Sequence, residues 1–330
     1  MSVTIKDVAK AAGVSTATVS RVLSGKDFFY SEKTEKKVKK AIRDLGYRKN
    51  TAAVELVTMK SKVIAVILPD TKTTFSNSII EGIQNEAFKI DLSVIILYIG
   101  NNDREKQKRA LTTVIERSVN GILLLSSQLE KENQELLNSS NIPYVYVSIA
   151  VQSENIRFIA SDDFQIGYQA ANFLINKGHK KIGLAALEPN TFIGRQRING
   201  YLRALNEHSL PSNENWIFSG NYSYDDGVQA MKYYGSDTEL TAIIGASDLA
   251  AIGIINQAKK IGFKVPQQLS VMSIDGTDAV NIVDPNLTSV TQSFYTMGVE
   301  SMKMLLNPEL KSKYTETKIE ERQSTGIFDL

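Results

Sequence analysis

The chain has 330 residues, of which none is cysteine and only two are histidine, His179 and His208. Without a thiol there is no disulfide framework, no thiolate metal site and no cysteine nucleophile. The two histidines lie far apart in the sequence, which argues against a histidine-rich metal cluster. We therefore expect no metal ion in this protein.

Long hydrophobic runs and nucleotide-binding loops are also missing. The longest apolar runs, such as Val63 to Leu68, have the length of a strand and not of a membrane span. The first ten residues, MSVTIKDVAK, lack the apolar segment of a signal peptide, so the expected location is the cytoplasm. No GxxxxGK loop occurs, and the glycines after the first apolar run do not form GxGxxG. These absences argue against nucleotide hydrolysis and dinucleotide chemistry, and we expect no cofactor.

Charge is divided unevenly along the chain. Residues 1–62 contain 14 Lys and Arg against 6 Asp and Glu, a net charge of +8, whereas the other 268 residues contain 24 against 30, a net charge of −6. The length suits a small head followed by one large or two medium domains. A strongly basic head on an acidic body is typical of a protein that contacts a phosphate backbone.

Within the basic head, residues 4–23 have the spacing of two short helices joined by a tight turn. Thr4 is the expected N-cap of the first helix, with Asp7 three residues later. Gly13 permits the turn, and Ser15 is expected to cap the second helix. Apolar residues follow helical spacing in both, namely Ile5, Val8, Ala9 and Ala12 in the first and Val19, Val22 and Leu23 in the second.

The outward face of the second helix carries small side chains and one cation: Thr16, Ala17, Ser20 and Arg21. Such a face lets a helix enter the major groove and touch base edges, with an arginine for a phosphate or a guanine. A third helix is predicted from Ser31 as N-cap to Leu45, with Gly46 as its stop. The pattern and the charge together predict a helix-turn-helix that binds DNA, in preference to a structural bundle with a solvated face.

From residue 62 onward, short apolar runs alternate with helical segments. The predicted strands are residues 63–69, 92–100, 121–127, 143–149, 180–187, 241–247 and 268–275. The predicted helices between them include residues 76–90, 103–118, 166–177, 195–208, 225–234 and 248–261. Because strand, helix and strand alternate, we expect parallel sheets covered on both faces, in two similar doubly wound halves.

Ligands of such sheets bind beyond the carboxyl ends of the strands. The loops at these ends should therefore converge on one cleft, and they carry Asp70, Ser126, Ser148, Asp162, Glu188, Ser247 and Asp275. Two carboxylates such as Asp162 and Asp275 would suit glycoside hydrolysis, or they would accept hydrogen bonds from ligand hydroxyls without catalysis. We favour binding, because the same chain carries a DNA-binding head.

The chain resembles the LacI/GalR family of bacterial transcriptional repressors over nearly its whole length. TIKDVAKAAGVSTATVSRVLSG resembles the headpiece signature of that family, and SEKTEKKVKKAIRDLGYRKN resembles its third helix and the approach to its hinge. Further segments follow the family's core in order: LPDTKTTFSNSIIEGI, VNGILLLSS, INKGHKKIGL, RQRINGYLRAL, TAIIGASDLAAIGI, PQQLSVMSIDGTD and PNLTSVTQ.

The resemblance implies an all-α helix-turn-helix headpiece followed by an α/β, periplasmic-binding-protein-like core of two doubly wound parallel-sheet subdomains. The expected boundaries are 1–48 for the headpiece, 49–61 for a hinge and 62–330 for the core. Within the core, the N-subdomain takes about 62–160 plus 292–320, and the C-subdomain about 161–291 plus the C-terminal end.

The resemblance also implies which residues contact DNA. Thr16 and Ala17 open the recognition helix and read bases, while further base or phosphate contacts come from Thr4, Ser15, Thr18, Ser20, Arg21, Ser31 and Asn50. The hinge would form a helix on the operator, with Ala53 and Leu56 at i and i+3 and Leu56 in the minor groove.

This chain departs from the family pattern near the hinge. The family usually has Pro where this chain has Lys49, and Arg-Ser where it has Val54 and Glu55. A carboxylate close to phosphates opposes binding, and β-branched residues form helices poorly. The turn KDFFYS is one residue longer than usual, and we expect Phe28 and Phe29 to pack on the headpiece.

In the core, Arg197 and Asp275 match the family's ligand-binding Arg and Asp, and Asp162 matches a third polar position. Phe75 and Tyr222 fall where the family has aromatic residues that stack on a ring. Ser247 replaces a usual Asn, and Ser148 with Ile149 replaces a common Asp-Arg pair. A guanidinium and carboxylates suit sugar hydroxyls, so the expected effector is a sugar.

The implied protein is a non-enzymatic homodimer that binds a pseudo-palindromic operator under control of a small molecule in the cleft. No leucine heptads follow EERQSTGIFDL, so no tetramer is expected. The dimer contact is expected at the helix that begins near Ser76 and the helix from Leu249 to Ile261. The alternatives are a regulator whose co-effector is a partner protein, a solute-binding protein and a sugar-processing enzyme.

Overall fold

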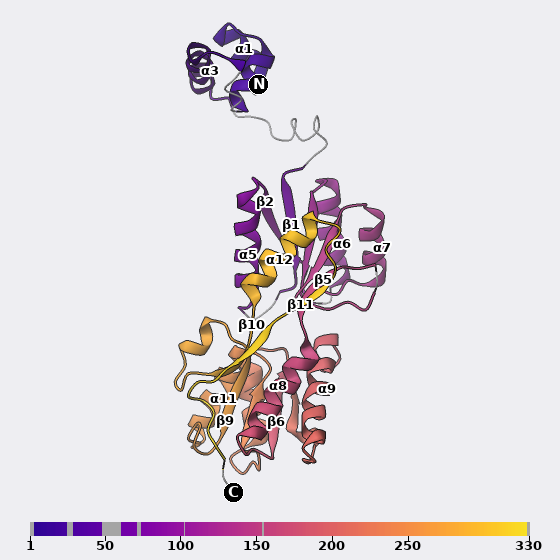
Figure 1. Ribbon diagram of the computed structural model, residues 1–330, viewed down its shortest axis with the longest axis vertical. Helices are drawn as coiled ribbons and strands as arrows, with labels where there is room; N and C mark the ends of the chain where they lie inside the picture. The colour runs from indigo at the N-terminus through magenta and orange to yellow at the C-terminus, as the bar shows by residue number, and fades with distance from the viewer. Residues whose placement is uncertain are drawn as a thin grey trace. The chain divides into compact units, whose positions relative to one another are not determined.

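The computed structural model describes residues 3–24, 29–47, 61–70, 74–101, 103–153 and 155–328. The chain forms two compact units, Met1–Ser61 and Lys62–Leu330. Figure 1 draws the first unit in indigo and the second from purple to yellow. None of the helices in the described ranges has both the length and the apolarity that a membrane span requires.

The first unit contains three helices in its described residues: α1 (Ile5–Ala12), α2 (Thr16–Leu23) and α3 (Glu32–Leu45). All three are where the sequence predicts them. Gly13 and Gly46 follow α1 and α3 in the left-handed conformation, with φ of 67° and 63°, which glycine adopts without steric cost. The shared core consists of Val8, Ala9, Ala12, Val19, Val22, Val38 and Ala41.

The second unit is built on two six-stranded sheets. In the first sheet the strands are parallel, and their order is β11-β5-β4-β3-β1-β2. The bounds of these strands are β1 (Val63–Leu68), β2 (Ser93–Tyr98), β3 (Gly121–Leu125), β4 (Tyr144–Val147), β5 (Phe158–Ser161) and β11 (Lys313–Thr315). We call this sheet and the helices on it the N-subdomain.

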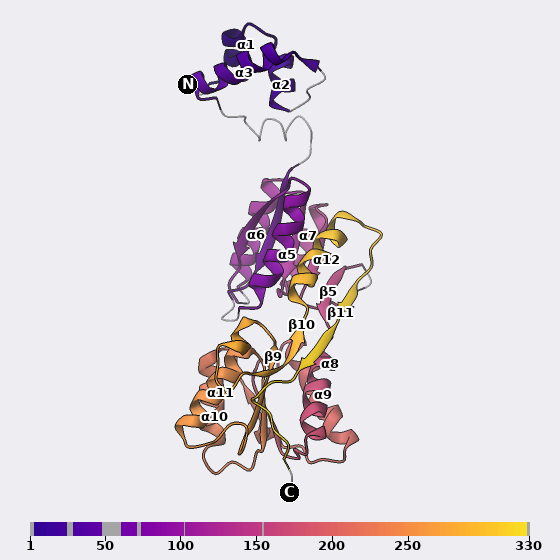
Figure 2. The same ribbon diagram turned by 60° about the vertical axis from the view of Figure 1, so that its left-hand side comes forward.

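Helices cover both faces of the N-subdomain sheet, as Figures 1 and 2 show. Alternate residues of β1 point to opposite faces, so Ile64 and Val66 pack under α5 and α12 whereas Ala65 and Ile67 pack under α6 and α7. The helices are α5 (Ser76–Lys89), α6 (Arg104–Glu116), α7 (Lys131–Ser139) and α12 (Phe294–Leu306). Burial on both faces explains why these strands are continuous apolar runs.

The second sheet, with its helices, forms the C-subdomain. Its order is β12-β10-β9-β8-β6-β7, and β12 is antiparallel to β10 whereas the other pairs are parallel. The strands are β6 (Ile182–Leu187), β7 (Ile217–Ser219), β8 (Ala242–Gly245), β9 (Ser270–Asp275), β10 (Thr288–Gln292) and β12 (Thr317–Glu320). One face packs under α8 (Asp163–Asn176) and α9 (Phe192–Glu207), the other under α10 (Tyr224–Tyr234) and α11 (Asp248–Lys260).

The chain crosses between the two subdomains three times. It passes from β5 to α8, from β10 to α12 and from β11 to β12. The third crossing corrects one detail of the expected layout, because residues 317–320 pair with β10 in the C-subdomain instead of belonging to the N-subdomain. The reason is that β12 has antiparallel ladder partners on β10, from Ser289 to Gln292.

Candidate functional site

Helix α2 presents the side chains that the sequence predicts for DNA reading. Ser15 caps the helix, since its hydroxyl accepts a hydrogen bond from the Thr18 amide at 3.1 Å. Val19 and Val22 are buried, while Ser15, Thr16, Ala17, Ser20 and Arg21 are exposed and Thr18 is half-buried. The first two turns of α2 therefore offer short polar side chains and one methyl group to a partner.

Thr4 and Ser31 act as helix caps in the structure. The backbone amide and the hydroxyl of Thr4 both donate to Asp7 Oδ2, at 2.8 and 2.7 Å, and these bonds lower the pKa of Asp7. Ser31 accepts from the Thr34 amide at 3.3 Å. Both caps are exposed at the ends of their helices, where a helix N-terminus attracts a phosphate group.

Phe29 lies beside the end of the recognition helix. It is 63% exposed, and the guanidinium carbon of Arg21 lies 5.5 Å from its ring centroid. The ring thus packs on the surface of the headpiece, against a cation of α2 and outside the headpiece core, in line with the expectation for Phe29. Phe28 lies outside the described residues.

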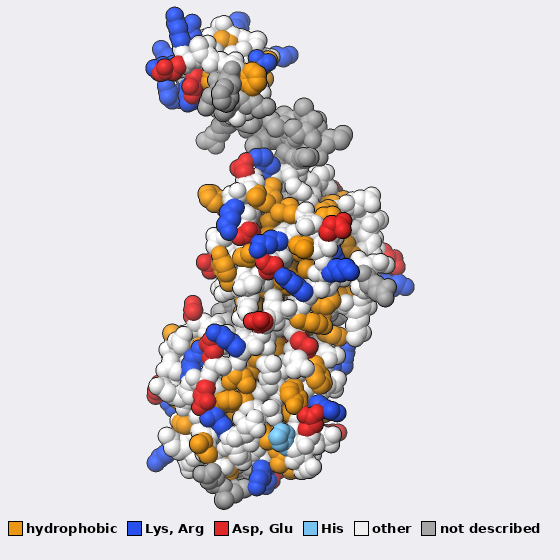
Figure 3. All heavy atoms as spheres, in the orientation of Figure 1, with side chains coloured by type: hydrophobic (Ala, Val, Ile, Leu, Met, Phe, Trp, Pro, Cys, Tyr) orange, Lys and Arg blue, Asp and Glu red, His pale blue; other side chains and the backbone are white. Residues whose placement is uncertain are grey.

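Many lysine and arginine side chains lie on the surface of the first unit, the headpiece, as Figure 3 shows in blue.

A cavity of about 710 Å³ lies between the two subdomains of the core. Its N-subdomain wall includes Phe75, Ser126 and Ser148, and its C-subdomain wall includes Arg197, Tyr222 and Asp275. Phe75 packs against Phe294, with ring centroids 5.2 Å apart, and both line the cavity. This combination of aromatic faces and convergent polar groups is typical of a small-molecule site.

Arg197 is the centre of a buried polar network in the C-subdomain. Its Nε donates to Asp163 Oδ1 at 2.9 Å, and Nη1 donates to the Ala246 carbonyl at 3.0 Å. The guanidinium carbon lies 5.9 Å from the centroid of the Tyr222 ring. The hydrogen bonds and the ring therefore fix the plane of the Arg197 guanidinium in the cavity wall.

Asp275 is held by a turn that Asp248 anchors. Asp248 accepts hydrogen bonds from Ser273 Oγ at 2.6 Å and from the Thr277 amide at 2.7 Å. Asp275 itself accepts from Gln292 Nε2 at 2.9 Å and is 6% exposed. Burial raises the pKa of Asp275 well above its usual range, and the nearby Asp248 carboxylate adds to the effect.

Two hydroxyls in the cavity wall are buried and lack a hydrogen-bond partner: Ser126 Oγ and Tyr222 OH. The Tyr222 hydroxyl lies near Thr191 and Glu188 without a hydrogen bond of good geometry. Four residues of this wall have left-handed φ values, namely Ser126 (46°), Ser148 (61°), Tyr222 (62°) and Asp275 (113°). Unpaired hydroxyls and backbone strain at one cavity indicate a site that a ligand completes.

Two families match the chain along its length. Residues 4–50 match the bacterial regulatory proteins of the lacI family, and residues 61–325 match the periplasmic binding proteins and sugar binding domain of the LacI family. The catabolite control protein A of Priestia megaterium is 34% identical to the chain, over 98% of the chain and 100% of that protein.

The chain belongs to the LacI family of bacterial regulatory proteins. Two solved structures of regulators have the same fold as this LacI-family member. A transcription regulator from Lactobacillus plantarum is 43% identical, covers 80% of this chain and 100% of its own, and has a TM-score of 0.75. The LacI-family regulator CCPA from Weissella paramesenteroides, solved with bound glucose, is 28% identical, covers 80% and 98%, and has a TM-score of 0.73.

Five of the seven strand-end residues expected at the cleft of this LacI-family core line the cavity: Asp70, Ser126, Ser148, Glu188 and Asp275. Asp162 and Ser247 do not. Asp162 is the N-cap of α8, and Oδ1 accepts from the Gln165 amide at 3.1 Å. Ser247 caps α11 and donates to the Tyr222 carbonyl at 2.6 Å. Both side chains turn toward a helix end, so the structure does not place them in the cavity wall where the sequence argument expected them.

The next residue, Asp163, reaches the cavity instead of Asp162, and the sequence argument missed it. It also missed Gln292 and Phe294, which line the cavity after β10. Ligands of such sheets bind beyond the carboxyl ends of the strands, and the same argument applied to the segment PNLTSVTQ would have identified Gln292. The expected hinge contacts of this LacI-family chain, Asn50, Ala53 and Leu56, lie outside the described residues, as do Lys49, Val54 and Glu55.

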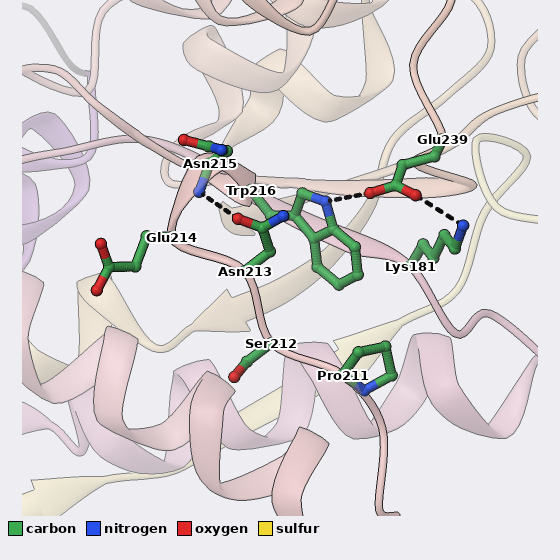
Figure 4. Close-up of a pocket in the computed structure, with 8 residues that line it drawn as sticks. All are labelled: Lys181, Pro211, Ser212, Asn213, Glu214, Asn215, Trp216 and Glu239. Atoms are coloured by element: carbon green, nitrogen blue, oxygen red, sulfur yellow. Dashed lines mark hydrogen bonds and ion pairs between the residues drawn. The ribbon is translucent and has the colours of Figure 1, made fainter.

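A second, shallow pocket lies on the C-subdomain surface around Trp216 (Figure 4). Its main polar groups already bind one another. Glu239 accepts from Trp216 Nε1 at 3.0 Å and pairs with Lys181 Nζ at 2.7 Å. Among the described residues, no three His, Asp or Glu side chains are grouped to hold a metal ion. The cavity between the two subdomains is therefore the stronger candidate for a ligand site in this LacI-family chain.

Proposed function

We propose that this protein is a sequence-specific transcriptional repressor whose affinity for its operator is set by a sugar in the interdomain cavity. The observation that carries the proposal is the pairing, in one chain, of an exposed recognition face on α2 with a strained cavity whose walls come from two subdomains. It acts in the cytoplasm and catalyses no reaction.

The DNA contacts of the proposal follow from α2. Thr16 and Ala17 stand at the first exposed turn and read base edges, while Ser20 and Arg21 contact bases or phosphates. Ser15, Thr18, Thr4 and Ser31 place backbone amides and hydroxyls at helix N-termini, which suit phosphate oxygens. The hinge residues Asn50, Ala53 and Leu56 complete the proposed interface.

The effector contacts follow from the cavity. Arg197 and Asp275 are preorganised donors and acceptors, and Phe75 and Tyr222 supply aromatic faces that suit the carbon side of a sugar ring. The glucose bound to the Weissella paramesenteroides regulator supports this choice of ligand. Binding is favoured over hydrolysis because Asp163 is tied to Arg197, and Asp275 to Gln292, which leaves neither free for acid-base work.

A homodimer fits the proposal, since two recognition helices would then meet the two halves of a pseudo-palindromic operator. The N-subdomain offers large exposed apolar side chains on α5 and on β2, an edge strand: Phe88 is 85% exposed and Tyr98 is 61% exposed. We propose that α5 forms part of the dimer contact, together with α11. Phe88→Glu should yield monomers in sedimentation, whereas Tyr233→Glu, on α10, should not.

Regulation follows from the three crossings. A ligand that contacts both walls binds one relative orientation of the subdomains better than others and so shifts their population. The shift changes the spacing of the paired headpieces and hence the affinity for DNA.

A gel-shift series tests the function. Operator-like duplexes selected from a random palindromic library are titrated at several salt concentrations, with and without a panel of sugars. We expect sequence preference, affinity that falls steeply with salt, and at least one sugar that changes the affinity. Affinity that is indifferent to sequence and to every sugar contradicts the proposal. Arg21→Ala should weaken DNA binding, while a matched change on α3, Lys33→Ala, should weaken it less.

A further inference from the structure

The charge of the cavity wall points to the chemical class of the effector, on the premise of the proposed function. The described lining residues include five carboxylates, Asp70, Asp163, Glu188, Asp226 and Asp275. Arg197 is the one Lys or Arg side chain among those same described lining residues. Because Asp163 pairs with Arg197 and burial raises the pKa of Asp275, the excess of negative charge in the wall comes from Asp70, Glu188 and Asp226. These carboxylates lie around a partly enclosed space, where fields are focused by the low-dielectric surroundings.

The one cation among the described lining residues is already paired with a carboxylate. Arg197 pairs with Asp163, and the two side chains are only 7% and 5% exposed. An anionic ligand would therefore have to compete with Asp163 for the guanidinium. It would also face Asp275, whose described hydrogen bond comes from a neutral amide.

Helix N-termini, which attract anions in many binding sites, are partly occupied here by the chain's own carboxylates. Asp163 is the first residue of α8, and Asp226 in the first turn of α10 accepts hydrogen bonds from the Asn221 and Ser223 amides at 2.9 and 3.1 Å. The N-termini of α5 and α9 have no acidic residue in the first turn. These two ends are where an anion would bind if the wall admitted one.

Two hydroxyl groups of the wall lack a hydrogen-bond partner, and a ligand hydroxyl is a suitable partner for each of them. Ser126 Oγ, from the N-subdomain, and Tyr222 OH, from the C-subdomain, are each able to donate and to accept one hydrogen bond. Both atoms are shielded from the cavity in this structure; a ligand hydroxyl that reaches either one after a small movement of the wall satisfies it without bringing in a charge. Phe75 and Phe294 add apolar surface that a phosphate group does not use.

We propose that the effector is a polyhydroxylated molecule without a phosphate or carboxylate group, and that the carboxylates of the cavity wall exclude the anionic forms of the same sugars. The exclusion comes from repulsion, so it acts on the whole class of sugar phosphates and sugar acids.

Matched pairs of probes test this assignment by titration calorimetry on the full chain: glucose with glucose 6-phosphate, fructose with fructose 1,6-bisphosphate, and cellobiose with cellobionic acid. We expect binding by at least one neutral member and affinity for its anionic partner that is lower by roughly tenfold or more. Any residual affinity for the anion should rise with salt, because salt screens repulsion. If free cations held the anion instead, its affinity would fall as the salt concentration rises.

Two sets of variants assign the effect to the wall. The double variant Asp70→Asn, Glu188→Gln removes two charges from the wall and keeps the shape of the side chains, so affinity for the anionic probe should rise relative to that for the neutral probe. Glu214→Gln removes one exposed charge outside the cavity and should change neither.

The assignment is overturned if an anionic probe binds as tightly as its neutral partner, or if no neutral probe binds. Operator affinity measured in the same preparations separates this result from failure of the regulator itself. A protein that binds DNA with sequence preference, and whose operator affinity responds to a sugar phosphate, remains a regulator but contradicts the anion exclusion.

Discussion

Arg197 on α9 and Asp163 at the start of α8 form a buried ion pair, in which Nε donates to Oδ1 at 2.9 Å. The pair joins two helices on the same face of the C-subdomain sheet and stands in the wall of the cavity. It therefore serves packing, and in the proposed function it serves ligand binding as well.

Removal of the guanidinium should destabilise the core strongly. We expect Arg197→Met to lower the free energy of unfolding by about 3–5 kcal/mol, because Asp163 then stays buried without its cation. Urea unfolding measures the loss. Arg203→Met, on the same helix, breaks only the exposed pair with Glu207 and should cost less than about 1 kcal/mol.

The same Arg197→Met variant separates the two proposed sites. At a temperature where it stays folded, it should bind operator DNA normally and no longer respond to a sugar. Weaker DNA binding by the folded variant would contradict the separation of headpiece and cavity.

Asp275→Asn should stabilise the ligand-free protein at neutral pH. The pKa of Asp275 is raised in the folded state, so the folded protein binds more protons than the unfolded chain above the usual pKa of 3.8, and stability falls as pH rises through that window. An amide at this position does not titrate, so the variant loses this pH-dependent decrease in stability. Its oxygen still accepts the hydrogen bond from Gln292. We expect a higher Tm at pH 7 and a flatter dependence of Tm on pH, together with weaker sugar binding.

His179 should make the core sensitive to acid. The side chain is 1% exposed, contacts Thr241 Oγ1 and Ser270 Oγ at 3.0 Å each, and stacks on Phe328. Burial lowers its pKa from 6.5 to about 4. As pH falls from 6.5 to about 4, the unfolded chain takes up a proton that the folded protein refuses, so stability is lost by up to about 3 kcal/mol.

Chemical unfolding at several pH values between 4 and 7 measures this loss. His179→Gln should show less of it, whereas His208→Gln, at an exposed histidine of the same subdomain, should keep the wild-type slope. Equal slopes for the wild type and His179→Gln would assign the acid sensitivity to other groups.

Phe29 should support DNA binding through Arg21. The exposed ring fixes the guanidinium at the end of the recognition helix by a cation–π contact of about 0.5–1 kcal/mol. Phe29→Leu should therefore weaken specific operator binding roughly two- to fivefold, while Phe29→Tyr, which keeps the ring, should bind as the wild type does. Gel shifts on the selected operator measure both variants, and unchanged binding by Phe29→Leu would exclude this role.

The strands and most helices of the core were predictable because burial on both sheet faces leaves continuous apolar runs such as Val63–Leu68. Their carboxyl ends then locate the cavity, which is why Ser126, Ser148 and Asp275 were found from sequence. The choice between neighbouring residues was not predictable. Asp162 and Asp163 differ only in which one caps α8, and that depends on the backbone turn between β5 and the helix.

The residues after β10 were harder to place for another reason. Gln292 and Phe294 enter the cavity because the chain returns to the N-subdomain there, and α12 packs beside α5. Apolar periodicity reports that a helix has a buried face but not which sheet covers it. The position of β12 depends on the same long-range pairing.

The three crossings also set an order of events during synthesis. The N-subdomain receives α12 and β11 from residues 294–315, so its sheet and one of its covering layers stay incomplete until nearly the whole chain has left the ribosome. In the headpiece, in contrast, the buried core residues that the structure describes lie within the first 41 positions. A nascent or prematurely ended chain can therefore carry a finished DNA-binding unit without a complete core, and the control by a ligand that we propose begins only once about the last tenth of the protein has been made.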